Sequence, residues 1–80
     1  MNIQAIRRLA AQFSSNELEV CINNQLKEHN NVCYQGSSEE ETIDSLSKAS
    51  YICQLMKQDN LSLNEAIRKL GQTIRDLHLK

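Results

Sequence analysis

Residues 38–57 read SEEETIDSLSKASYICQLMK, and this stretch decides the fold of the chain. Its apolar residues recur at the three- and four-residue steps of a helix, at Ile43, Leu46, Ala49, Ile52, Cys53 and Met56. Ser38 precedes Glu41 by three residues, the spacing of a capping box, in which two side chains bind each other's backbone N–H groups. Carboxylates at residues 39–41 also match the positive end of a helix dipole. We therefore predict a central helix here, ending near residues 59–60.

The same capping pattern opens two further helices. Ser14 with Glu17 predicts a helix over residues 15–28, and Ser62 with Glu65 predicts a last helix from residue 62 to about residue 78. A shorter first helix is expected over residues 2–12, where apolar residues also follow helical spacing. The three boxes are evenly spaced, which we interpret as one capping solution used repeatedly, with an ancestral duplication as the alternative.

The segment between the second and central helices predicts an ordered loop. Residues 29–37 carry paired asparagines, a glycine and a serine, which favour turns. We expect Val32 or Tyr34 to pin this loop to the core. On the preceding helix we expect one inward stripe, made of Leu18, Cys21, Ile22 and Leu26.

Composition points to an all-α fold in a single domain, residues 1–80. The 80 residues are 40% hydrophobic but only 4% aromatic, with no Trp and no Pro, so the core must consist of aliphatic side chains. We predict a compact bundle of four helices, in which a C-terminal helical hairpin is covered by two shorter N-terminal helices. A core this small leaves a thin margin of stability.

The charge pattern argues against a general polyanion binder. The net charge is −1, and the basic excess of such a binder is missing. Residues 14–47 carry one lysine against seven acids, whereas residues 1–13 and 48–80 are net basic. The ordinary interpretation is that the acidic and the basic segments lie on different solvent-exposed faces of the protein. The alternative is a partner that meets one charged face.

Cysteine usage and hydropathy predict a reduced, cytoplasmic protein with no membrane span. Cys21, Cys33 and Cys53 are an odd number, and the N-terminus lacks the apolar core of a signal peptide. We expect Cys21 and Cys53 in the core and Cys33 exposed in the loop, with all three thiols free. No stretch approaches the roughly 20 apolar residues that cross a bilayer.

No motif in the chain carries chemistry. Cysteines and histidines do not occur at metal-ligand spacing, and the two glycines stand apart, which excludes a glycine-rich phosphate loop. A bundle of short side chains also leaves little volume for acid–base catalysis. We predict no enzyme activity, no catalytic residue, no metal and no cofactor.

A helix-turn-helix is the strongest rival interpretation. Two predicted helices joined at residues 13–14 resemble that motif, in which the second helix enters the major groove. However, the second helix begins with Glu17 and Glu19, where phosphate and base contacts belong, and its first base is Lys27 near the far end. We therefore keep a nucleic-acid-associated regulator as the alternative to a protein-binding function.

The last helix carries a heptad-like seam that predicts an interface. The seam consists of Leu63, Ile67, Leu70, Ile74 and Leu77, and with Gly71 at its margin these residues are the candidate interface. The N-terminal helices are short, so we expect part of this seam to stay uncovered in a monomer. A second copy would cover it. The sequence therefore predicts a homodimer with Gly71 at or near a close helix crossing.

The N-terminus resembles a family of short bacterial proteins without assigned function. The matching residues are Met1, Asn2, Ala5, Ile6, Arg7, Arg8, Leu9 and Ala10, followed by Glu17, Leu18 and Glu19. The resemblance implies a bacterial, cytoplasmic origin and a compact helical fold, and it carries no activity and no site. We expect a protein–protein interaction or adaptor module whose partner is another protein or a second copy.

Overall fold

Helices make up most of the chain in a computed structural model, which describes residues 2–78 and the side chains of residues 2–75. The four helices are α1 (Ile3–Gln12), α2 (Ser15–Glu28), α3 (Glu39–Gln58) and α4 (Leu63–His78). Each lies within a residue or two of its predicted bounds. The all-α, four-helix fold is therefore confirmed.

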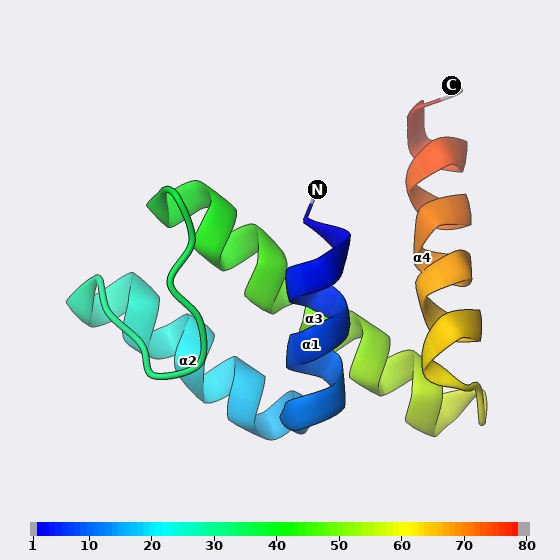
Figure 1. Cartoon of the computed structure of the whole chain (residues 1–80), viewed down its shortest axis with the longest axis horizontal. Coiled ribbons are helices and arrows are strands. Elements are labelled where there is room, and N and C mark those ends of the chain that lie inside the picture. The colour runs from blue at the N-terminus through cyan, green and yellow to red at the C-terminus, as the bar shows by residue number, and fades with distance from the viewer. Residues whose placement is uncertain (1, 79–80) are drawn as a thin grey trace.

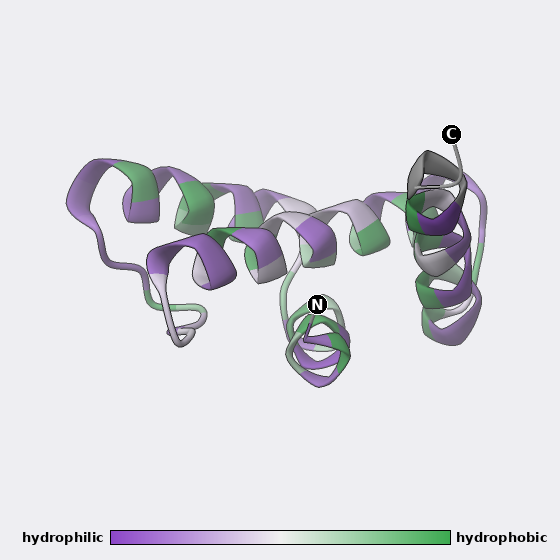
Figure 2. Ribbon diagram, turned by 90° about the horizontal axis from the view of Figure 1, so that it is seen from above, coloured by the Kyte–Doolittle hydropathy of each residue, from purple (hydrophilic) through white to green (hydrophobic). Residues whose placement is uncertain are grey.

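Helix α3 is the centre of the arrangement. It lies side by side with α2, while α1 crosses on one side of this pair, nearly end-on when seen from above (Figure 2). Helix α4 follows α3 through a short turn and packs against the end of α3 and against α1 (Figure 1). The last two helices are consecutive and in contact, but the most extensive pairing is that of α2 with α3, not that of the two C-terminal helices from which a hairpin was predicted.

Small residues on α3 explain why it can occupy the centre. Leu46, Ala49 and Ile52 are fully buried, and Thr42 and Ser45 are buried beside them. Short side chains allow neighbouring helices to approach closely while interior packing stays dense. Ile6 and Leu9 from α1, Leu18 from α2, and Ala66 and Leu70 from α4 complete one continuous core.

The predicted caps are present, with one difference. Glu17 N–H donates to Ser14 Oγ (3.2 Å) and Ser14 N–H donates to Glu17 Oε1 (2.9 Å), a complete capping box, and Ser62 with Glu65 forms a second. Ser38 Oγ accepts from Glu41 N–H (3.1 Å), but the Glu41 side chain does not return to Ser38. It accepts a hydrogen bond from the loop instead.

Packing around the loop between α2 and α3 meets one expectation, through Tyr34, and corrects another, on α2. Val32 is 92% exposed and pins nothing, whereas Tyr34 is half-buried and donates from its hydroxyl to Glu41 Oε1 (2.7 Å). Leu26, expected inside, is 57% exposed, and Gln25 is buried in its place. The Gln25 amide stays satisfied because its Oε1 accepts from Asn31 Nδ2 at 2.7 Å.

The prediction of three free thiols is wrong. Cys21 and Cys33 form a disulfide that ties the loop to α2, and Cys53 is the free cysteine. Asn31 bends the loop back over α2, since its Oδ1 accepts from the N–H groups of both Cys33 and Tyr34 (2.9 Å each). Helical periodicity does not reveal that return path, so spacing alone could not pair these two cysteines.

Candidate functional site

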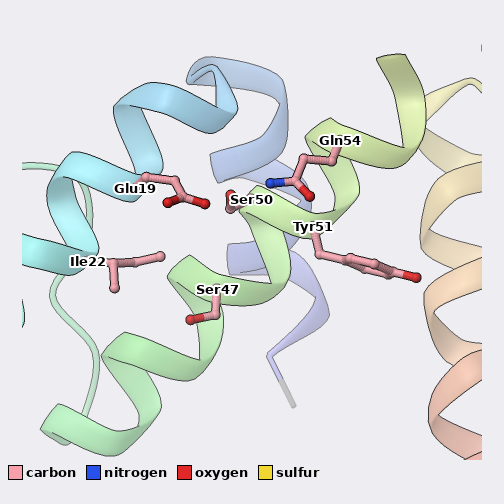
Figure 3. A pocket seen from close by; sticks show the side chains of 6 residues that line it. All are labelled: Glu19, Ile22, Ser47, Ser50, Tyr51 and Gln54. Atoms are coloured by element: carbon pink, nitrogen blue, oxygen red, sulfur yellow. The ribbon is translucent and has the colours of Figure 1, made fainter. Parts of the chain in front are cut away.

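A shallow pocket of about 190 Å³ lies between α2 and α3 and is the best candidate for a functional site. We call it the α2–α3 groove. Figure 3 shows its lining, which consists of Glu19, Ile22, Ser47, Ser50, Tyr51 and Gln54. Helix α1 lies behind the pair in that view.

Helical geometry places these six side chains in two rows. Glu19 and Ile22 are one turn apart on α2, and the four lining residues of α3 also recur at helical spacing, so each set shares one helix face. The groove stays open because α3 presents short serine side chains where α2 approaches it. Longer apolar residues at Ser47 and Ser50 would fill this space.

The Ser50 hydroxyl is the most unusual group in the groove. Ser50 is only 3% exposed, and its Oγ has no hydrogen-bond partner among the described residues. A buried polar atom without a partner costs about 1–3 kcal/mol. In Figure 3 the Glu19 carboxylate and the Gln54 amide both point toward Ser50, while the Tyr51 ring points away toward α4.

A second buried polar cluster is structural. Tyr34 Oη donates to Glu41 Oε1, and Ser45 Oγ lies 3.4 Å from the same oxygen. The hydrogen bond to the Glu41 carboxylate, followed by burial, raises the pKa of the Tyr34 hydroxyl. Glu41 Oε2 is buried without a partner among the described residues and lies where Gly36 leaves room for it. This cluster fastens the loop to α3.

A wider hollow of about 400 Å³ lies beside the turn between α3 and α4, lined by Leu61, Glu65, Arg68, Lys69 and Gln72. The fold already uses two of its charges. Lys69 Nζ pairs with Asp59 (2.7 Å), and this bond raises the pKa of Lys69. Glu65 caps α4, and hydrogen bonds from the backbone and side chain of Ser62 lower its pKa. We therefore rank this hollow below the α2–α3 groove.

The predicted interface residues of α4 serve mainly the chain's own core. Leu70 is buried, while Leu63, Ile67 and Ile74 are half-buried and pack against the core. The side chain of Leu77 lies outside the described residues. The described part of this seam is therefore covered in part by α1 and α3, and Ile67, Gly71 and Ile74 keep part of their surface exposed.

Gly71 does not lie at a close helix crossing within the chain. A Cβ added there would meet nothing within 4 Å. The sequence predicts a crossing of Gly71 between two copies, and that expectation stays a prediction. Contacts within one copy do not bear on a helix crossing between two copies in a dimer.

Other expected absences concern metals and membranes. Among the residues that the structure describes, no three potential metal-ligating side chains gather, and no helix combines the length and apolar character that crossing a bilayer requires.

Cys53 is half-buried under α1, with its Sγ 3.3 Å from the Phe13 carbonyl oxygen, and burial raises the pKa of its thiol.

Sequence reasoning missed the α2–α3 groove. No sequence pattern assigns a role to Tyr51, and Glu19 enters the functional argument from sequence as a charge that repels DNA. A usable signal was present, since Ser47, Ser50 and Gln54 repeat polar residues at helical spacing on a helix that is otherwise a core element.

Comparison of the chain with protein-family models, curated proteins and solved structures found no match.

Proposed function

We propose that this chain is a protein–protein interaction or adaptor module whose contact site is the α2–α3 groove. The supporting observation is that the fold does not use the polar groups of the groove. The side chains of Glu19, Ser47, Ser50 and Gln54 make no hydrogen bond or ion pair with any described residue. Polar side chains that converge without serving the fold are available to a partner.

The alternatives are weaker on the same residues. The groove contains one carboxylate and no histidine or cysteine, so it offers no acid–base pair and no activated nucleophile, and we propose no enzyme activity. DNA binding remains the runner-up. Glu17 is held in the cap of α2 and Glu19 lines the groove, so both carboxylates would repel phosphate at the end of α2 that a helix-turn-helix inserts.

Site-specific photo-crosslinking in the source cells tests this function. A photoreactive residue at Ser47, which is exposed at the groove, should give a discrete protein adduct, while the same residue at exposed Gln4 on α1 should not. Equal adducts from both positions, or none from Ser47, would contradict the proposal. Binding to a DNA duplex that weakens steeply with salt would support the runner-up, because phosphate contacts release counterions.

Self-association through α4 is a second proposal, carried over from the sequence. Ile67, Gly71 and Ile74 are half-exposed and lie on one edge of α4, and the space above Gly71 is open. Analytical ultracentrifugation at micromolar concentration should show a dimer that Ile74→Asp dissociates, with a circular dichroism spectrum recorded to confirm folding. A monomer at these concentrations removes the proposal. A dimer that a folded Ile74→Asp variant retains moves the interface elsewhere.

The cytoplasmic location and bacterial origin are also proposals. The Cys21–Cys33 disulfide weighs against a reducing cytoplasm, where thiols are kept reduced. Alkylation of thiols in intact cells decides the location. Three modified cysteines would agree with the cytoplasm, whereas modification of Cys53 alone would place the chain in an oxidising compartment.

A further inference from the structure

The buried hydroxyl of Ser50 indicates what the α2–α3 groove binds. Ser50 is 97% buried (3% exposed), its Oγ lacks a partner in the described chain, and it lines the groove rather than a closed void. We propose that the groove takes the guanidinium group of an arginine side chain presented by a partner protein. This inference rests on the proposed function and specifies the chemistry of the partner.

The groups lining the groove match a guanidinium. Glu19 supplies a carboxylate, Ser47 and Ser50 supply hydroxyl oxygens, and Gln54 supplies an amide oxygen, so hydrogen-bond acceptors come from both helices (Figure 3). A guanidinium has five N–H donors and no acceptor, and its planar fork binds carboxylates through two parallel hydrogen bonds. Each acceptor is also without another partner in the described chain.

Charge favours a cation and disfavours an anion. The groove is lined by Glu19 and by no basic side chain. Three of its six lining residues, Glu19, Ile22 and Ser47, belong to the segment 14–47, which carries seven acids and one lysine. A field of one sign attracts an oppositely charged group and raises the rate of encounter. A phosphate or a carboxylate would meet repulsion from Glu19 and no compensating cation.

Size and shape favour one side chain of a larger partner. About 190 Å³ is less than the about 300–1,000 Å³ of pockets that enclose a small molecule. The Ile22 side chain lines the α2 wall and can cover the methylene stem that precedes a guanidinium. Lysine fits less well, because its ammonium is a strongly hydrated point charge with three donors.

The test is a titration of the whole ¹⁵N-labelled chain, followed by NMR, with N-acetyl-arginine amide as the probe. Saturable shifts should concentrate at Glu19, Ser47, Ser50 and Gln54. N-acetyl-citrulline amide, which has the same shape without the charge, should give no saturable shift. N-acetyl-lysine amide should bind several-fold more weakly.

Matched variants separate the groove from general surface charge. Glu19→Gln should weaken binding of the arginine probe roughly tenfold, because it replaces a charge-assisted hydrogen bond with a neutral one. Glu28→Gln removes the same charge from an exposed position about two and a half turns further along α2, on the opposite side of that helix, and should leave the affinity unchanged. Equal losses in the two variants would overturn the proposal.

The outcomes also distinguish this inference from the proposed function. No saturable arginine shift, together with a crosslink from Ser47, would overturn arginine recognition while keeping a protein-binding groove. Tighter binding of the lysine probe would likewise overturn it in favour of an ammonium. Absence of both the shift and the crosslink would remove the groove as a binding site altogether.

Discussion

Gly36 and Gly71 form a matched pair of sites at which the same substitution should act in opposite directions. Gly36 lies in the loop before α3, where its N–H donates to Thr42 Oγ1 (2.9 Å). An added Cβ would lie 1.7 Å from Glu41 Oε2 and 2.9 Å from Thr42 Oγ1. Real Cβ atoms do not approach heavy atoms this closely, so Gly36→Ala must displace the Glu41 side chain.

The magnitude follows from what Glu41 loses. Moving this carboxylate breaks its 2.7 Å hydrogen bond from Tyr34, and a hydrogen bond to a charged group contributes about 1.5–3 kcal/mol. The overlapping atoms belong to side chains that can rotate away, so overpacking itself adds little. The reduced freedom of the unfolded chain offsets about 0.4–1 kcal/mol. We expect Gly36→Ala to lower the free energy of unfolding by about 2 kcal/mol.

Gly71→Ala is the control for this substitution. Nothing lies within 4 Å of the added Cβ, and Ala exceeds Gly in helix propensity by about 1 kcal/mol, so the free energy of unfolding should rise by about that amount. Urea unfolding followed by circular dichroism at low protein concentration measures both variants. A Gly36→Ala variant within about 0.5 kcal/mol of the parent, a typical surface effect, would refute the packing described for Glu41.

Three further predictions concern the cap, the disulfide and pH. Ser14→Ala should lower the free energy of unfolding by about 1 kcal/mol, the usual cost of losing an N-cap, and an unchanged urea midpoint would contradict the cap. Reduction of the Cys21–Cys33 bond, which spans 12 residues, should cost roughly 3 kcal/mol, measured by urea unfolding with and without a dithiol. Tyr34 has a folded pKa above its unfolded value near 10.0, so the folded state binds more protons and its stability should fall as pH rises above 10. Tyr34→Phe should flatten that fall, and an identical pH profile would exclude this hydroxyl as its source.

Much of the fold could be predicted because its signals are local. A capping box needs only two residues three positions apart, so Ser14 and Glu17 marked the start of α2 correctly. The bounds of α3 followed from its apolar period and acidic first turn. The order and lengths of the helices therefore follow from short stretches of sequence.

The errors about the cysteines and about the buried face of α2 have one physical origin, which is the path of the loop in space. Cys33 meets Cys21 only because Asn31 turns the loop back over α2, and Gln25 is buried because the same asparagine satisfies its amide. Neither contact can be predicted from the periodicity of apolar residues in the sequence. The stripe on α2 therefore predicted Leu26 inside when Gln25 takes that place.

The α2–α3 groove could not be predicted for a related reason. A groove depends on what two helices fail to fill, which requires their separation as well as their sequences. Ser47 and Ser50 are ordinary residues for a helix surface, and only the approach of α2 encloses the Ser50 hydroxyl without pairing it. Likewise, the sequence identifies the α4 seam as apolar, but only the structure shows how far α1 and α3 cover it.

The stability of Ser50→Ala tests most directly whether the groove is held ready for a partner. If the hydroxyl serves only a ligand, its removal relieves a buried unpaired group and should raise the free energy of unfolding by about 1 kcal/mol or more, while weakening the binding of N-acetyl-arginine amide. Ser47→Ala, at an exposed position one turn away, should gain only the helix-propensity difference of about 0.5 kcal/mol. A Ser50→Ala variant less stable than the parent would contradict the account, because the hydroxyl would then be part of the fold.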